Sequence, residues 1–191
     1  MKAILERTYV GTPLGKMSII TSSRGLCGLE FIEPRRLEML SARLAHGYPG
    51  SEVHDGANAE LKAAARWVER YFAGDFQALD AIARDLPLDL LGTSFEKAVW
   101  GALLDISVGQ LSTYGGLAKA LSRPAGAARA VGMAVGRNPI SILVPCQRIV
   151  GASGAITGYG GGLDRKEWLL RHEGCSLRGR SGDRRLTVTP P

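Results

Sequence analysis

One cysteine in this sequence stands where a thiol can react. Cys146 lies in the stretch ILVPCQRIV, where Pro145 ends an apolar run and forces a turn at the sulfur. A thiol at a turn, beside the basic Arg148, is better placed for nucleophilic attack than a thiol inside a strand. A cysteine after an apolar run is also commonly a small buried hydrophobic residue. The local pattern leaves both interpretations open.

The remaining cysteines and the histidines show no chemical pattern. Cys27 lies in a strand-like segment and Cys175 begins the C-terminal tail, so we interpret both as structural. The sequence contains no C-x-x-C pair, and its three histidines are widely separated. These spacings indicate neither a zinc site nor a disulfide framework, so we expect no metal and no cofactor.

A second candidate is a pair of short helices, predicted from TYGGLAKALSR and GAARAVGMAVGR. Two helices joined by a tight turn are typical of a helix-turn-helix, whose second helix enters a DNA groove. The second helix surrounds Arg129 with small residues, namely Ala127, Ala128, Ala130 and Gly132. A helix face of small residues can approach a narrow groove closely, so that one long cationic side chain can enter the groove. It also suits a helix packed tightly on another helix, with Arg129 extending to water.

The elements that position these residues follow from periodicity. Residues 1–32 alternate apolar and polar positions between Gly, Pro and Ser turns, which predicts β-strands. Residues 34–46 and 59–73 predict amphipathic helices. The expected buried face of the second helix consists of Leu61, Ala64, Ala65, Val68 and Phe72. Residues 75–93 are expected to be an extended linker.

The second half of the sequence predicts mainly helices. FEKAVWGALLDI follows a cap at Thr93-Ser94, and LDRKEWLLRHEG is expected to begin at Asp164 as N-cap and to end at Gly174. Between the helices, ISILV predicts a buried strand and GASGAITGYGGG a glycine-rich loop. The expected organisation is a domain over residues 1–90, a domain over residues 91–175 and a disordered basic tail over residues 176–191.

Charge divides the chain near the same boundary. Residues 1–90 hold 11 Lys and Arg against 12 Asp and Glu, whereas residues 91–191 hold 13 against 6. A basic second half favours a polyanionic partner, nucleic acid first, although basic composition also aids solubility. No apolar run reaches the roughly 18–20 residues of a membrane helix, so we expect no membrane partner and a cytoplasmic location.

From Phe95 to Gly174 the sequence resembles the methylated-DNA–protein-cysteine S-methyltransferases, also called the 6-O-alkylguanine-DNA alkyltransferase family. The stretches that carry the resemblance are FEKAVWGALLDISVGQLSTYGGLA, GAARAVG, GRNPISILVPCQR and GYGGGLDRKEWLLRHEG. TPLGKMSIITSSRGLCGLEF carries a looser resemblance in the first half. The resemblance implies an α/β (α+β) protein, with a small ribonuclease-H-like sheet domain before a mainly helical domain whose helix-turn-helix is winged-helix-like.

The resemblance also implies roles for individual residues. Cys146 is the alkyl acceptor, which takes the group from 6-O-alkylguanine, and from 4-O-alkylthymine, in a single turnover. Arg129 enters the minor groove and fills the space of the flipped nucleotide, with Ala128, Ala130 and Gly132 giving clearance. Tyr114 protonates the leaving guanine at N3. The expected partner is double-stranded DNA carrying alkylated guanine, bound by a monomer that is nucleoid-associated in a bacterium.

Further positions complete the implied site. The base pocket consists of Ile149, Tyr159 and Gly160, with the main-chain carbonyls of Cys146 and Ile149 accepting from the exocyclic amine and the Gly160 amide facing the alkylated oxygen. Asn138 bridges the second helix and the thiol turn, although a simple turn asparagine explains it equally well. Phosphate contacts are expected from Lys119, Arg123 and Arg137.

The sequence departs from the family at one position. The family motif Pro-Cys-His-Arg is here Pro-Cys-Gln-Arg, so Gln147 replaces the histidine that passes the thiol proton toward a glutamate, here Glu173. Glutamine has no proton to exchange near neutral pH, but its amide can still contact Glu173. Two hypotheses follow, namely slower transfer or a lesion sensor that binds without repairing.

Two further functions are less well supported. A sequence-specific regulator needs side chains that read base edges along the second helix, where this sequence has alanine and glycine. A thiol hydrolase needs a histidine base directed at Cys146, and His172 adjoins Glu173 on a different helix face. Alkyl transfer to Cys146 is therefore the function that the sequence favours.

Overall fold

The computed structural model describes residues 3–178 and 187–189 and divides into two compact units. The first unit comprises Met1–Thr93 together with Pro139–Leu143, and the second comprises Ser94–Asn138 together with Val144–Pro191. The mixed α/β fold expected from the sequence is confirmed. The assignment of residues 139–143 to the first unit was not expected.

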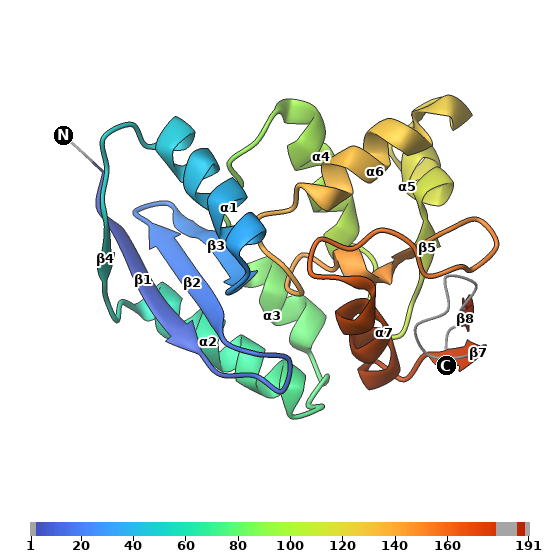
Figure 1. Ribbon diagram of the computed structural model, residues 1–191, viewed down its shortest axis with the longest axis horizontal. Coiled ribbons are helices and arrows are strands. Elements are labelled where there is room, and N and C mark those ends of the chain that lie inside the picture. The colour runs from blue at the N-terminus through green and yellow to red at the C-terminus, as the bar shows by residue number, and fades with distance from the viewer. Residues whose placement is uncertain (1–2, 179–186, 190–191) are drawn as a thin grey trace. The chain divides into compact units, whose positions relative to one another are not determined.

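The first unit is built on a four-stranded sheet in the order β3-β2-β1-β4 (Figure 1). β1 pairs antiparallel with β2 and parallel with β4, and β2 pairs antiparallel with β3. The strands are β1 (Leu5–Val10), β2 (Met17–Ser22), β3 (Gly25–Phe31) and β4 (Val53–Asp55). β4 lies in a turn-rich stretch where no strand was expected, because three residues are too few to show a period.

Helices α1 (Pro34–Gly47) and α2 (Ala59–Phe72) cover opposite faces of this sheet (Figure 1). Pro34 stands at the start of α1, where its missing N–H is not needed. Asn58 caps α2, because its side chain accepts from the Leu61 amide at 2.8 Å. The core face of α2 includes Trp67 and Tyr71 in place of the predicted Ala65 and Phe72, so the predicted stripe was rotated. The segment expected to be extended contains α3 (Leu79–Asp85).

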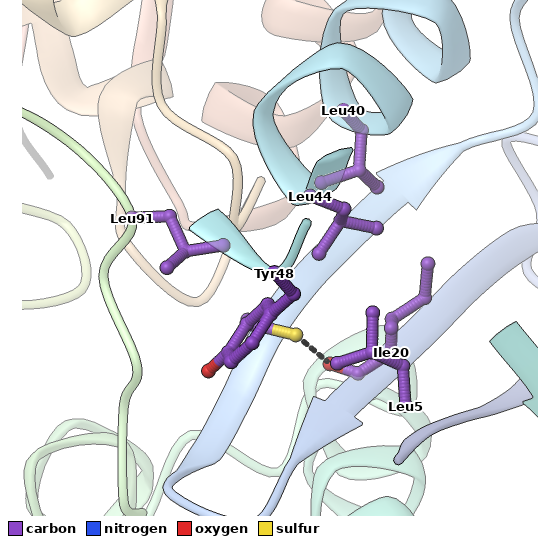
Figure 2. Packing of buried hydrophobic residues seen from close by; sticks show 7 residues of the cluster. Leu5, Ile20, Leu40, Leu44, Tyr48 and Leu91 are labelled. Atoms are coloured by element: carbon purple, nitrogen blue, oxygen red, sulfur yellow. Dashed lines mark hydrogen bonds between the residues drawn. The ribbon is translucent and has the colours of Figure 1, made fainter. Parts of the chain in front are cut away.

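One hydrophobic cluster fills the space between α1 and the sheet (Figure 2). It contains Leu5, Ile20, Cys27, Leu40, Leu44, Tyr48 and Leu91. Cys27 is fully buried and its thiol donates to the Ile20 carbonyl, the dashed line in Figure 2. Burial raises the pKa of Cys27 to about 12, so this cysteine is structural, as its strand position predicted.

The segment Pro139–Leu143 is held against β3. Leu29 donates to the Pro139 carbonyl at 3.0 Å, and the Ser141 amide donates to the Leu29 carbonyl at 2.7 Å. These bonds form an isolated bridge between Leu29 and Ile140, after which Ile142 turns with a φ of 70°. The predicted ISILV strand is therefore wrong: the run is buried, but the left-handed Ile142 ends its extended course after one bridge.

The second unit is mainly helical. Its elements are α4 (Ser94–Leu104), α5 (Tyr114–Ala120), η1 (Ala125–Ala127), α6 (Ala128–Gly136), η2 (Cys146–Arg148) and α7 (Leu163–His172). Helices α4, α5 and α6 pack on one another (Figure 1), and Trp100 of α4 donates to the Ala134 carbonyl of α6 at 2.8 Å. β5 (Ser112–Thr113) pairs parallel with β6 (Ile149–Val150).

Two predicted details of the C-terminal part are wrong. Gly162, with a φ of 93°, is the N-cap of α7, whereas Asp164 lies inside its first turn. The tail was expected to be disordered from residue 176, but β7 (Ser176–Arg178) pairs antiparallel with β8 (Thr187–Thr189). The β-branched sequence TVT suits a strand, and Leu177 packs against a small core of the second unit. Residues 179–186 and 190–191 of the predicted tail lie outside the described residues.

Candidate active site

Cys146 begins the short helix η2, directly after Pro145. Its amide donates to the Val144 carbonyl at 2.8 Å, and the same carbonyl accepts from the Asn138 side chain at 2.8 Å. Asn138 follows α6 and is buried, so one amide group connects the end of the second helix to the thiol turn. The side chain of Cys146 is 6% exposed, which is less open than its turn position suggested.

Glu173, directly after α7, forms a buried network with two residues of η2. Its carboxylate accepts from Arg148 Nε at 2.8 Å and from Gln147 Nε2 at 2.9 Å. Arg148 also donates to the Ile106 carbonyl. The predicted contact between Gln147 and Glu173 is confirmed. The prediction that Arg148 favours reaction of the thiol is not confirmed, because the Arg148 guanidinium is directed to Glu173 and its charge is balanced there.

Tyr114 is the first residue of α5 and lies at the same site. Thr113 caps this helix by accepting from the Gly116 amide at 2.9 Å. The Tyr114 hydroxyl lies 3.2 Å from the Thr157 carbonyl and 3.4 Å from the Gly158 carbonyl. Burial, with a smaller contribution from the Cys146 charge, raises the pKa of Tyr114, so its phenol keeps its proton near neutral pH.

The tyrosine ring gives Gly132 of α6 a role that the sequence did not show. A Cβ on Gly132 would stand 3.4 Å from Tyr114 Cδ1, so the ring lies directly against this glycine. Arg129 and Ala130 are exposed and Ala128 is half-buried. The exposed face also includes Met133, which is 55% exposed. The small residues around Arg129 are therefore joined on this face by one large side chain, whose size in the sequence already distinguished it from its neighbours.

The candidate phosphate contacts differ in their surroundings. Arg137 forms an ion pair with Glu96 at 3.5 Å, and the Arg123 guanidinium lies 5.7 Å from the centre of the Phe95 ring. Lys119 is exposed on α5. Cations that already have a partner have less freedom to contact a phosphate, so Lys119 is the best placed of the three.

The predicted base-pocket residues do not all share one environment. Ile149 is buried, Tyr159 is half-buried and Gly160 is exposed. The Cys146 carbonyl accepts from the Ile149 amide, and the Ile149 carbonyl accepts from Lys166. Both of the carbonyls expected to accept from the base therefore already accept a hydrogen bond within the protein.

Sequence reasoning missed Lys166. This residue of α7 is fully buried, and its ammonium donates to three main-chain carbonyls at the site. The sequence does indicate that Lys166 is buried, because this residue precedes the buried Leu169 and Leu170 by three and four positions. This spacing places it on the core face of the helix. Within residues 3–178 and 187–189, no group of three His, Cys, Asp or Glu residues could hold a metal ion.

The fold and the site define a class of proteins with two compact units. One unit contains both a helix-turn-helix and a buried cysteine in a hydrogen-bonded turn. Two family descriptions match: "6-O-methylguanine DNA methyltransferase, DNA binding domain" over residues 94–175, and the "ribonuclease-like domain" of the same family over residues 5–90. The chain therefore belongs to the 6-O-methylguanine DNA methyltransferase family, as the sequence resemblance predicted.

Individual relatives agree. A methylated-DNA–protein-cysteine methyltransferase of Shigella flexneri is 54% identical over 181 residues, which cover 93% of this chain and 99% of the relative. The protein of that name from Mycobacterium bovis is 40% identical over 164 residues, covering 86% and 89%. The crystal structure of Mycobacterium tuberculosis OGT in complex with DNA has a TM-score of 0.70 at 37% identity, covering 88% of this chain and 92% of that one.

Proposed function

We propose that this protein repairs DNA by moving the alkyl group of 6-O-alkylguanine onto its own Cys146, once per molecule. The observation that carries the proposal is that one unit contains both the Cys146 thiol, a nucleophile, and the Tyr114 phenol, a proton donor whose pKa is raised by burial and by the charge of Cys146. An alkyl aryl ether needs a soft nucleophile, which a thiolate provides without a cofactor. The DNA complex of the Mycobacterium tuberculosis structure supports double-stranded DNA as the partner.

The proposed reaction places each group in a role. The alkylated oxygen is out of reach inside the base stack, so the nucleotide must be flipped out of the duplex. Arg129 then occupies the position that the nucleotide has left. The Cys146 sulfur bonds to the alkyl carbon while the carbon–oxygen bond breaks, and Tyr114 donates its proton to guanine N3. Ile149, Tyr159 and the Gly160 amide line the base, and 4-O-alkylthymine fits the same chemistry. A monomer suffices, because the residues invoked come from one chain.

The location is inferred from the substrate. None of the helices in the described parts of the chain is long and apolar enough to cross a bilayer. A protein that repairs DNA must act where the chromosome is, so we infer a cytoplasmic, nucleoid-associated location.

Mass spectrometry after incubation with a duplex containing 6-O-methylguanine tests the proposal. We expect a methyl mass increment on the peptide that carries Cys146, with one methyl group per molecule, and no increment in Cys146→Ser. Tight binding to the lesion without any increment would replace the proposal by a sensor function. The contact of Gln147 with Glu173 favours retained transfer, because Gln147 still donates to the glutamate at 2.9 Å from the position beside the thiol.

A further inference from the structure

Helix α6 has one exposed face, and a large apolar side chain lies in the middle of it. Arg129 and Met133 of α6, and Arg137 directly after it, are exposed and follow one another at intervals of four residues, so they share one face. Met133 is 55% exposed, whereas Leu163, the other large apolar residue exposed in the described part of the second unit, is 39% exposed. The face therefore presents a cation, an apolar chain and a second cation in that order.

The backbone on both sides of Met133 is held in place by packing within the unit. A Cβ on Gly132 would stand 3.4 Å from Tyr114 Cδ1, and the Ala134 carbonyl accepts from Trp100 of α4 at 2.8 Å. Met133 itself is exposed, so its side chain contributes little to the core. Its place on the helix is nevertheless fixed by its neighbours. A side chain held in this way is suited to contact a partner of α6.

The charges beside Met133 indicate the kind of partner. Arg129 precedes it by one turn, and Arg137, whose ion pair with Glu96 leaves its side chain 53% exposed, follows it by one turn. A DNA groove complements this order, because phosphates line its two edges and the bases form its less charged floor. The unit that contains α6 also matches the DNA binding domain of its family. DNA is therefore the partner that this face fits best.

We propose that Met133 is a second minor-groove contact beside Arg129, and that its side chain packs against the base pair next to the flipped nucleotide and keeps that pair unstacked. The two residues leave the helix about 6 Å apart along its axis, which is within two base steps of about 3.4 Å. Methionine is one of the apolar side chains that act as wedges in the minor groove, and its unbranched chain adapts to irregular gaps. The inference rests on the proposed function, to which it adds a DNA contact.

The proposed contact acts on DNA binding and not on the chemistry at the thiol. Unstacking a base step costs free energy, which the burial of an apolar side chain in the groove offsets. The contact involves no charge, so it releases no counterion and should leave the salt dependence of binding unchanged. These two properties distinguish it from a phosphate contact, which changes affinity and salt dependence together.

Fluorescence anisotropy tests the proposal with the full chain and a labelled duplex that contains 6-O-methylguanine. All proteins carry Cys146→Ser, so that no transfer occurs during the measurement. Met133→Ala should weaken binding by about tenfold without changing the slope of affinity against salt concentration. Met133→Leu keeps the apolar volume and should bind as tightly as the parent protein. Met39→Ala is the matched control and should not change the affinity, because Met39 is an exposed methionine of α1 in the first unit.

A second measurement tests the unstacking itself. The duplex carries 2-aminopurine next to the lesion, and the fluorescence of this base rises when it loses its stacking. At saturating protein we expect a smaller rise with Met133→Ala and an unchanged rise with Met133→Leu. Because Met133 is exposed, neither substitution should change the urea midpoint, which verifies that the variants are folded.

Several results would overturn the proposal. Equal affinity and equal fluorescence in Met133→Ala and its parent would do so, as would weaker binding with an unchanged fluorescence rise or a shallower salt slope. If sedimentation without DNA shows a dimer that Met133→Ala dissociates, Met133 contacts a second copy of the chain instead. Methyl transfer to Cys146 in the wild type, together with unaltered binding by Met133→Ala, refutes this inference alone. The expected loss of binding without methyl transfer refutes the proposed function alone.

Discussion

The three cysteines of this protein show how strongly the environment of a cysteine controls the pKa of its thiol. Burial raises the pKa of Cys27 to about 12 and that of Cys175 to about 11. Both thiols lie in hydrophobic clusters, Cys27 among Leu5 and Ile20 and Cys175 against Leu170. Cys146, by contrast, begins a short helix whose next two residues, Gln147 and Arg148, both donate to Glu173. Two of the three cysteines are therefore structural, and we expect the third, Cys146, to be the reactive one.

We expect iodoacetamide at pH 8 to modify Cys146 and to leave Cys27 and Cys175 unmodified while the protein is folded. At that pH only about one in a thousand thiols with a pKa of about 11 is ionised. Peptide mapping by mass spectrometry measures the three sites separately. In urea all three should react, and preferential modification of Cys175 in the folded protein would contradict the assignment.

Position 147 offers the second prediction at this scale. Gln147→His places a titratable group against Glu173, so we expect methyl transfer to accelerate by about a hundredfold near neutral pH, at the low end of general acid–base effects. Rapid quenching with a methylguanine duplex measures the rate. Gln147→Asn is the matched control, because it has no exchangeable proton either. If Gln147→His transfers the methyl group no faster than the wild type, proton transfer at position 147 does not limit the rate.

At the scale of elements, the site depends on the glycine-rich loop after β6. Its Thr157 and Gly158 carbonyls connect α7, through Lys166, with α5, through Tyr114. Gly158 takes a positive φ, and its missing Cβ leaves space for the tyrosine hydroxyl. The loop is thus a structural link between two helices and not only a connection between β6 and α7.

Gly158→Ala should displace the Tyr114 hydroxyl, because the new Cβ would stand 2.8 Å from its oxygen. We expect a loss of about 1 kcal/mol in the free energy of unfolding from the left-handed backbone and a fall of about tenfold or more in transfer rate from the misplaced donor. Urea denaturation and single-turnover kinetics measure the two effects. Gly162→Ala has open space around its Cβ but at least as large a backbone cost, because a φ of 93° with a ψ of 150° is adopted almost only by glycine. Its transfer rate should therefore stay normal although its stability falls.

At the scale of the whole molecule, the segment just before the thiol turn belongs to a different unit from the residues on either side of it. Residues 139–143 belong to the first unit, although α6 before them and Cys146 after them belong to the second. Within the first unit the Ser141 hydroxyl donates to Glu30 at 3.0 Å, and Glu30 also accepts from Arg36 Nε at 2.9 Å. This buried network secures the segment that leads to the thiol turn.

Arg36→Met should destabilise the protein by about 3–5 kcal/mol, because it leaves the buried Glu30 carboxylate without its cation. Ser141→Ala removes one hydrogen bond and should cost about 1 kcal/mol. Urea denaturation compares both with Arg35→Met, an exposed neighbour on α1 that should change stability by about 0.5 kcal/mol or less. Equal effects of Arg36→Met and Arg35→Met would show that the buried pair does not matter.

The sequence by itself determined the features that are encoded locally. The β period of residues 1–32, the stripe of α2 and the proline before Cys146 are properties of neighbouring residues, and the structure confirms the elements that they predict. The motifs around Cys146 also identified the family. Predictions failed where local pattern is weak or ambiguous, as in the three-residue β4, in α3 and in the apolar ISILV run, whose burial suits a turn as well as a strand.

The tertiary structure alone decided which charges face one another. Arg148 and Glu173 are 25 residues apart, and Glu30 and Ser141 are 111 apart, so no periodicity relates them. Arg148 adjoins the thiol turn in sequence, yet its guanidinium is directed to Glu173. Electrostatic interactions depend on distance and burial in space, which the order of residues does not specify. The candidate nucleophile was therefore recognisable in the sequence, whereas the buried partners of Arg148 and Lys166 were not.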